Sequence, residues 1–272
     1  MSLLPSNAAG PTPSPGTPGE GGGEGSAWND TLLQNPHAVA DKRSRVQKMF
    51  AAIAPSYDIN NRLHSLWMDQ RWRKKAVKLA EVKPTDVVVD VACGTGDLTL
   101  AFDRAKPQAA WGIDFTFEML PLARSKSAIR NPQSEISFLN GDAQALPLPD
   151  ESADIVSIAF GIRNVQDPLA ALKEFHRILR PGGRVIILEF SLPTNPILRG
   201  LYNFYFRKIL PRTATFISGD KTGAYKYLPE SVNTFISREK MMQMMRDAGF
   251  QSVEQFPLTF GVCICYRGVC AV

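Results

Sequence analysis

Features that would place this chain in a membrane, in a secretory route or around a metal ion are scarce in its sequence. Its 272 residues include four cysteines and three histidines, and no two cysteines have the CxxC spacing of a zinc site. No apolar run approaches the roughly 20 residues that a membrane-spanning helix needs. We therefore expect a cytoplasmic protein with reduced thiols and without a metal centre.

The N-terminal segment lacks positive charge. Residues 1–41 contain no lysine or arginine and are rich in proline, glycine and serine. A secretory signal needs a basic start and a mitochondrial transit peptide needs arginines, so neither is expected. Because such a composition cannot bury enough apolar surface to fold, we expect residues 1–41 to form a disordered tail without a catalytic role.

The rest of the chain shows two kinds of pattern. Apolar residues recur at helical spacing from residue 42 to 79, with an interruption at Pro55, which predicts an N-terminal helical cap over residues 42–82. From residue 83 onward, apolar runs alternate with helical patterns. Strands are expected at Val87–Ala92, Ala109–Asp114, Ile136–Asn140, Asp154–Phe160, Arg184–Phe190, Val253–Phe256 and Gly261–Val269, and helices at Asp97–Arg104, Phe117–Ile129, Pro168–Leu179 and Arg238–Ala248.

This alternation predicts the fold class. Continuous apolar strands are typical of a parallel sheet that is covered on both faces, and right-handed crossovers give a doubly wound, Rossmann-like α/β fold. We expect seven mostly parallel strands with an antiparallel C-terminal strand, because the last two strands are joined closely. Residues 191–235 interrupt the alternation and are expected to form a helical lid inserted into a domain of residues 83–272.

A small-residue loop follows the first expected strand. It runs from Asp90 through Gly94 and Gly96 to Asp97, where a helix is expected to begin. The two glycines permit a sharp turn and the close approach of a ligand. A carboxylate at the helix start disfavours a phosphate and favours a cationic ligand such as S-adenosylmethionine. The alternative is a tight turn without a ligand.

Two further acidic positions follow the next two strands. Asp114 lies about twenty residues beyond the glycines, where this architecture binds a ribose through its hydroxyls; the alternative is a helix N-cap. Asp142 and Ala143 follow the third strand, where the carboxylate can accept from an adenine amine and Ala143 can donate its backbone N–H. The alternative for this pair is an ordinary Gly-Asp turn.

Three longer motifs make the chain similar to a known family. They are Tyr57-Asp58-Ile59-Asn60-Asn61-Arg62-Leu63-His64-Ser65, Phe160-Gly161-Ile162-Arg163-Asn164-Val165, and Leu179-Arg180-Pro181-Gly182-Gly183-Arg184 followed by Leu188-Glu189-Phe190-Ser191. Over residues 42–272 the chain resembles the class I S-adenosylmethionine-dependent methyltransferases, and most closely the C-methyltransferases of menaquinone and ubiquinone biosynthesis.

The resemblance implies a site for S-adenosylmethionine as the methyl donor. It places cofactor contacts at Thr95, Asp114, Asp142 and Ala143. Some relatives have a serine where this chain has Ala159, so a contact there can use only the backbone or the methyl group. The expected cofactor-binding residues are Asp90, Gly94, Thr95, Gly96, Asp114, Asp142, Ala143 and Ala159.

Ring C-methylation requires a quinol hydroxyl to lose its proton, and a phenolic pKa near 10 means that a protein group must assist. We expect Arg163 to stabilise the phenolate and to position a water as proton acceptor, with Asn164 orienting it and Tyr57 closing the site. The alternative is that Arg163 pairs with a structural acid such as Asp167 or Glu174.

Two more titratable residues lie within the family motifs. His64 is a second candidate base, although a histidine beside Leu63 and Leu66 is more often packed and hydrogen-bonded. Glu189 ends a buried strand, either near the cofactor or as a structural acceptor.

The resemblance implies a lipophilic polyprenyl quinol as substrate. Conversion of demethylmenaquinol to menaquinol is expected first; 2-methoxy-6-polyprenyl-1,4-benzoquinol of ubiquinone biosynthesis or another small molecule is the alternative. Residues 198–212 combine aromatic and basic side chains, which suits either a helix on the inner face of the cytoplasmic membrane or a packed lid helix. A homodimer is compatible with the sequence.

Other functional classes fit less well. The net charge of +5 is compatible with nucleic acid. However, the chain has no Pro-Pro for the loop of amino-methylating enzymes and no Pro-Cys for a covalent ring-methylating enzyme, so no nucleic-acid partner is expected. Ala92 and Asp97 disfavour an NAD-dependent oxidoreductase, and the intact loop argues against a non-enzymatic binding module.

Overall fold

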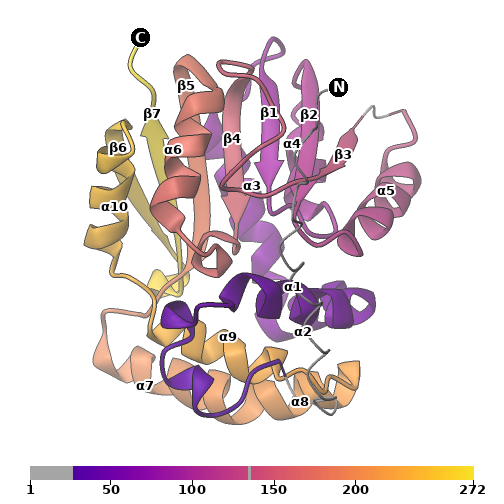
Figure 1. Cartoon of the computed structure of the whole chain (residues 1–272), viewed down its shortest axis with the longest axis vertical. Coiled ribbons are helices and arrows are strands. Elements are labelled where there is room, and N and C mark those ends of the chain that lie inside the picture. The colour runs from indigo at the N-terminus through magenta and orange to yellow at the C-terminus, as the bar shows by residue number, and fades with distance from the viewer. Residues whose placement is uncertain (1–26, 134–135) are drawn as a thin grey trace, which may run out of the picture.

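A seven-stranded sheet lies at the centre of the molecule, with helices on both of its faces (Figure 1). The computed structural model describes residues 27–133 and 136–272. Of the described strands, which lie in the order β3-β2-β1-β4-β5-β7-β6, β7 alone runs opposite to the others. The strands are β1 (Val87–Val91), β2 (Ala109–Asp114), β3 (Ser137–Asn140), β4 (Ala153–Ala159), β5 (Leu179–Phe190), β6 (Gln251–Leu258) and β7 (Cys263–Val269).

The helices form two groups. Those that pack on the sheet are α3 (Met68–Ala80), α4 (Asp97–Asp103), α5 (Met119–Arg130), α6 (Pro168–Ile178) and α10 (Arg238–Asp247). Those that form a separate layer beyond the carboxyl ends of the parallel strands, at the bottom of Figure 1, are α1 (Lys42–Ile53), α2 (Tyr57–Ser65), α7 (Pro196–Phe204), α8 (Leu210–Ser218) and α9 (Ala224–Asn233). Short 3-10 turns occur at Leu32–Gln34, Pro36–Ala38, Ala54–Ser56, Ile162–Asn164 and Thr259–Gly261, and a π turn at Tyr205–Ile209.

Both faces of the sheet are buried. Successive strand residues point to opposite faces, so Val88 packs in the core beside α3 and α4, whereas Val89 packs in the core beside α6 and α10. Two-sided burial explains why the strands are continuous apolar runs rather than alternating ones. The predicted doubly wound α/β class with an antiparallel C-terminal strand is confirmed.

Part of the segment expected to be disordered packs against the folded domain. Residues 1–26 of the expected tail lie outside the described residues, but the expectation of disorder is wrong for residues 27–41. Trp28 is 1% exposed and stacks on Tyr227 with ring centroids 4.4 Å apart, Leu33 is buried, and a ring nitrogen of His37 lies 2.8 Å from the Ser231 carbonyl oxygen. These few residues pack against α9. The average composition of residues 1–41 did not indicate this contact, because most of the segment is proline, glycine and polar residues.

The expected cap of residues 42–82 divides between the two helix groups. Leu66 and Trp67 adopt left-handed backbone conformations with φ of +50° and +61°, which ends α2 and starts α3 in a new direction. α1 and α2 face the carboxyl edge of the sheet. α3 instead packs on the sheet through Trp72 and Ala76, against Ile186 of β5.

Residues 191–235 contain α7, the π turn, α8 and α9. Within the stretch 198–212, Tyr202 and Leu210 are buried, whereas Leu201 and Phe204 are more than half exposed. The segment thus packs against the helical layer on one side and presents apolar side chains on the other. In the described parts of the chain, no helix is both long and apolar enough to cross a membrane.

Arg184 of β5 joins the end of α3 to the sheet, and its removal should destabilise the fold. Its guanidinium donates to Ala80 O at 2.7 Å, Glu81 O at 2.9 Å and Asp86 Oδ2 at 2.5 Å, all in a buried setting. We expect Arg184→Met to lower the free energy of unfolding by about 3–5 kcal/mol in urea titrations, because Asp86 is left buried without its counter-charge.

The matched control is Arg180→Met. Arg180 pairs with Asp154 at 2.6 Å, but its side chain is 42% exposed, so this loss should cost about 1 kcal/mol or less. Equal losses of stability in the two variants would contradict the structural role of Arg184.

Candidate active site

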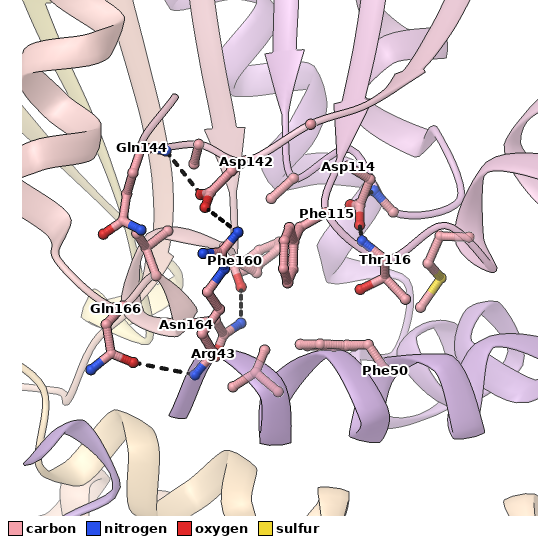
Figure 2. A pocket seen from close by; sticks show the side chains of 18 of the residues that line it. Arg43, Phe50, Asp114, Phe115, Thr116, Asp142, Gln144, Phe160, Asn164 and Gln166 are labelled. Carbon is pink, nitrogen blue, oxygen red and sulfur yellow. Dashed lines mark hydrogen bonds and ion pairs between the residues drawn. The ribbon is translucent and has the colours of Figure 1, made fainter. Parts of the chain in front are cut away.

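A cavity opens where the carboxyl ends of the strands meet the helical layer (Figure 2). We call it the first cavity. It encloses about 780 Å³ of empty space, a size typical of pockets for small cofactors. Residues from the strand ends and from the cap line it, among them Gly94, Asp114, Phe115, Asp142, Ala143, Ala159, Phe160 and Asn164, with Arg43, Val46, Phe50 and Tyr57.

Asp114 lies at the end of β2 and lines the first cavity. Its Oδ2 accepts the backbone N–H of Gly94, and its Oδ1 that of Thr116, both at 2.7 Å. Gly94 presents its N–H from a left-handed conformation with φ of +56°. Burial raises the pKa of Asp114 to about 6. Because α5 begins only after Glu118, Asp114 does not cap it, and each oxygen retains a lone pair for a ligand hydroxyl.

Asp142 and Ala143, the residues predicted to contact an adenine, also line the first cavity. Asp142 accepts the Gln144 N–H at 3.0 Å and forms a 2.8 Å ion pair with Arg43 of α1. The Arg43 guanidinium also lies 4.4 Å from the centroid of the Phe115 ring. The carboxylate that was expected to face a ligand therefore faces a cation from the cap as well.

Asp90 and Gly96 stabilise the loop after β1 through contacts with residues outside the wall of the first cavity, and neither lines that cavity. Asp90 accepts the hydroxyls of Thr99 and Ser157, both at 2.7 Å, and burial raises its pKa to about 6. A Cβ on Gly96 would lie 3.2 Å from the Phe138 ring. These two residues shape the loop, whereas Gly94 lines the first cavity.

A charged network ties α2 to the same loop. The Thr95 hydroxyl donates to Asp58 at 2.7 Å, and Lys126 contacts Asp58 and, at 3.1 Å, Asp97. Arg62 lies 2.6 Å from the other oxygen of Asp97. Burial alone would raise the pKa of Asp97, but the surrounding cations outweigh it and lower the pKa to about 2. The expectation that Asp97 faces a cationic ligand is wrong, since protein cations already neutralise it.

The loops after β1 and β4 press against each other in strained conformations. Ala92 and Phe160 have positive φ angles of +51° and +59°, and a Cβ on Gly161 would lie only 2.7 Å from the Ala92 Cβ. Non-glycine residues rarely adopt this conformation, and such strain gathers at functional sites. Here it places Phe160 in the walls of two adjoining cavities.

The second cavity lies beside the first, under the lid helices, and encloses about 700 Å³ of empty space. The two cavities share the aromatic residues Phe50, Tyr57 and Phe160. The rings of Phe160 and Phe190 lie 4.5 Å apart, with the Arg73 guanidinium 5.2 Å from the first ring and the Arg163 guanidinium 5.4 Å from the second. This wall offers stacking surfaces to an aromatic ligand.

Arg163 lines the second cavity and is held by three neighbours. Its Nη1 donates to Glu189 at 2.6 Å and to Phe160 O at 2.9 Å, and its Nε donates to Ser231 at 3.2 Å. Burial alone would lower the pKa of Arg163, but Glu189 raises it above its usual range, so the guanidinium stays charged. Its Nη2 has no hydrogen-bond partner among the residues that the structure describes, and its two N–H groups remain available.

The alternative that Arg163 pairs with a structural acid is confirmed, but the two acids given as examples, Asp167 and Glu174, are wrong. Asp167 caps α6 by accepting from Leu169 N and Ala170 N, and Glu174 pairs with Arg177 of the same helix at 2.6 Å. The partner is Glu189 of β5, which the sequence left open as a structural acceptor.

Three other predicted residues, Tyr57, Asn164 and His64, do not all line the same cavity. Tyr57 lines both cavities, and a Cβ on Gly94 would lie 3.8 Å from its ring; burial raises the pKa of Tyr57. Asn164 lines only the first cavity, where it donates to Phe160 O and accepts from Tyr227, and the structure shows no hydrogen bond between it and Arg163. Both ring nitrogens of His64 have protein partners, and His64 lines neither cavity.

Several wall residues were not predicted. Arg43 and Phe50 come from α1, whose helical spacing was visible although its packing partner was not. Phe115 and Phe190 each follow an acidic residue at a strand end. Their position at the carboxyl edge was the available signal, because side chains there meet whatever occupies the site.

Comparison with known proteins identifies a family and several similar sequences. The model of the ubiE/COQ5 methyltransferase family matches residues 38–270. A demethylmenaquinone methyltransferase of Thermus thermophilus is 47% identical over 221 residues, covering 81% of this chain and 99% of that protein. The ubiquinone/menaquinone biosynthesis C-methyltransferase UbiE of Geobacter sp. (strain M21) is 43% identical over 234 residues, covering 85% and 99%.

Solved structures support the fold. A chain from the complex of the Haloferax volcanii Trm112 methyltransferase activator with a methyltransferase superposes with a TM-score of 0.59 at 22% identity, covering 82% of this chain and 98% of its own. A SAM-dependent methyltransferase of Thermotoga maritima gives 0.55 at 23% identity, covering 82% and 99%. The fold, the family model and the sequence relatives agree: the chain belongs to the ubiE/COQ5 methyltransferase family.

Proposed function

We propose that this protein transfers a methyl group from S-adenosylmethionine to a ring carbon of demethylmenaquinol and so forms menaquinol. The observation that carries the proposal is the junction of the two cavities at Tyr57 and Phe160. One cavity has strand-end carboxylates that suit a nucleoside, and the other has the neighbouring rings of Phe160 and Phe190 and a free guanidinium edge. The relatives in Thermus thermophilus and Deinococcus radiodurans, both named demethylmenaquinone methyltransferase, support a naphthoquinol substrate.

The residues of the first cavity fit the donor. S-adenosylmethionine, when bound, supplies an electrophilic methyl group on a sulfonium. Asp114 would accept the ribose hydroxyls through its remaining lone pairs. Asp142 would accept from the adenine amine in competition with Arg43, and Ala143 would offer its backbone N–H. Ala159 has no hydroxyl and contributes only its backbone and methyl group.

The junction of the two cavities would hold the two reactants in position and keep water away from them. Tyr57 lies over the Gly94 loop from the cap, and Phe160 lines both cavities beside Phe190. A quinol ring beside Phe160 and Phe190 would present a carbon toward the first cavity. Holding the reacting atoms in this way, away from water, lowers the entropic cost of reaction.

Arg163 would stabilise the charge that develops on the quinol. The ring carbon becomes nucleophilic when the neighbouring hydroxyl loses its proton, and the N–H groups of Nη2 are placed to donate to the resulting oxygen. Methyl transfer to that carbon would break the methyl–sulfur bond. The carbon would lose its proton to water and the oxygen would regain one, so that a single proton would be released overall. Because Arg163 stays protonated beside Glu189, it acts as a donor and not as the base.

The lid would bring the enzyme to its lipophilic substrate. Residues 196–218 contain four basic residues and no acidic one, and Ile197, Leu201 and Phe204 are each more than 60% exposed. Exposed apolar side chains beside basic ones favour contact with an anionic membrane surface. We infer that this face binds the membrane peripherally.

The proposed reaction is tested with the purified protein, methyl-labelled S-adenosylmethionine and each candidate quinol in its reduced form. We expect the label on the naphthoquinol ring carbon of demethylmenaquinol, identified by mass spectrometry. A higher kcat/KM on 2-methoxy-6-polyprenyl-1,4-benzoquinol would make that ring the substrate. Absence of label in both products would refute quinol methylation.

Arg163→Lys should lower kcat about 100-fold, because a lysine keeps the charge but loses the free N–H pair at the phenolate oxygen. Binding of S-adenosylmethionine, measured by calorimetry, should stay within about twofold, since Arg163 is outside the first cavity. The control is Glu189→Gln, which leaves Nη2 in place and should lose far less activity at equal loss of thermal stability. Parallel losses of kcat in both variants would assign Arg163 a structural role only.

Membrane contact is tested by cosedimentation with phosphatidylcholine vesicles that contain phosphatidylglycerol. We expect Arg199→Ser/Lys208→Ser to weaken binding at low salt, and wild-type binding to fall at high salt through screening. Lys173→Ser/Lys240→Ser removes the same charge from exposed positions on α6 and α10 and should bind normally. Equal binding by both double variants would argue against the lid as the membrane face.

A further inference from the structure

A third cavity continues from the second. It encloses about 680 Å³ of empty space between α2, α3, the π turn, α8 and α9. It shares a set of wall residues with the second cavity, namely Asn61, Ser65, Phe190, Tyr225 and Leu228. It shares none with the first cavity. The three cavities thus lie in a row, with the second in the middle.

We propose that the third cavity binds the first isoprene units of the substrate's prenyl chain. The inference rests on the proposed function, because a ring in the second cavity must let its long substituent leave away from the methyl donor. The third cavity adjoins the second on the side that does not lead to Asp114 and Asp142. An apolar chain is the ligand that its walls suit.

The chemistry of the walls supports an apolar ligand. Met68, Phe206, Leu210, Leu228 and Val262 contribute apolar surface. Several of the polar side chains are already bonded within the protein. His64 contacts Asn60 O and the Thr213 hydroxyl, the Ser65 hydroxyl donates to Asp69, and the Trp72 indole N–H donates to Thr259 at 2.8 Å. Two buried polar atoms of wall residues, Asn60 Oδ1 and the Tyr225 hydroxyl, have no hydrogen-bond partner in the described residues, and the rest of the wall is apolar or already bonded.

Exposed apolar residues adjoin two wall residues of this cavity along the chain. Leu66 and Trp67 precede Met68, and Phe260 follows Thr259. Leu66, Trp67 and Phe260 are 78%, 61% and 80% exposed. Thr259 and Phe260 have positive φ angles of +44° and +55°, as Leu66 and Trp67 also do. Strained turns and exposed apolar side chains are typical of functional surfaces, and beside the third cavity they would let the rest of the chain pass to lipid.

The proposal is tested by filling the third cavity. Val262 and Met68 line it but not the second cavity, so Val262→Phe and Met68→Phe place a ring in the chain's path. Displacing about two methylene groups from the wall should raise KM about tenfold for a farnesylated demethylnaphthoquinol. The KM for the same quinol without a tail should not change. Ile129→Phe, an exposed position on α5, is the matched control.

Binding of farnesol, an isoprenoid alcohol without a ring, gives a readout independent of methyl transfer. Calorimetry should show binding to the wild type and to Ile129→Phe, and about tenfold weaker binding to the filled variants. Equal farnesol affinity in folded Val262→Phe and Met68→Phe, or an equal rise of KM for both quinols, would overturn the proposal. Farnesol binding without methylation of any quinol would refute the proposed function and leave the chain site standing.

Discussion

A buried ion pair links the parts of the molecule that must stay in register. Glu189 ends β5, Arg163 lies in the turn after β4, and Ser231 on α9 accepts from the same guanidinium. The two charged side chains are 5% and 2% exposed, and charges so deeply buried are tolerated only while they are paired. Arg163 also donates to Phe160 O, so the pair sets the position of the ring at which the first two cavities meet. The sheet, the loop after β4 and the lid are therefore joined through the side chain of Arg163.

The two sides of the proposed reaction are built by different means. The donor side consists of strand ends, and Asp114 is oriented there by backbone N–H groups that belong to the sheet and its loops. The acceptor side combines Phe160, Arg163 and Phe190 from the same edge of the sheet with side chains from helices beyond it, including Tyr57 and Tyr227. A sheet edge of this kind serves many reactions, since the helices that cover it can differ. The aromatic side chains that the helices add to the second cavity would contribute to the selection of the acceptor.

The fold was largely readable from the sequence, because strand burial and helix periodicity are local patterns. Asp114 and Asp142 were placed correctly at the cavity, since the carboxyl ends of parallel strands meet at one edge. The partners of charged residues were not readable. Arg163 pairs with Glu189, 26 positions away, and not with the acids next along the chain. Asp97 meets cations from α2 and α5 that local sequence does not bring near it. Such pairings depend on which helix faces which loop, and periodicity carries no information about that.

The stacking of Trp28 on Tyr227 joins two ends of the chain that are made at different times. Tyr227 in turn donates to Asn164 at 2.9 Å. During synthesis the N-terminal segment leaves the ribosome first, long before α9 exists. Contacts with such large sequence separation form late, because their closing loop is costly. All the wall residues of the first cavity precede α9 in the chain, whereas α9 itself supplies part of the wall of the second cavity. The second cavity can therefore close only after α9 has been synthesised.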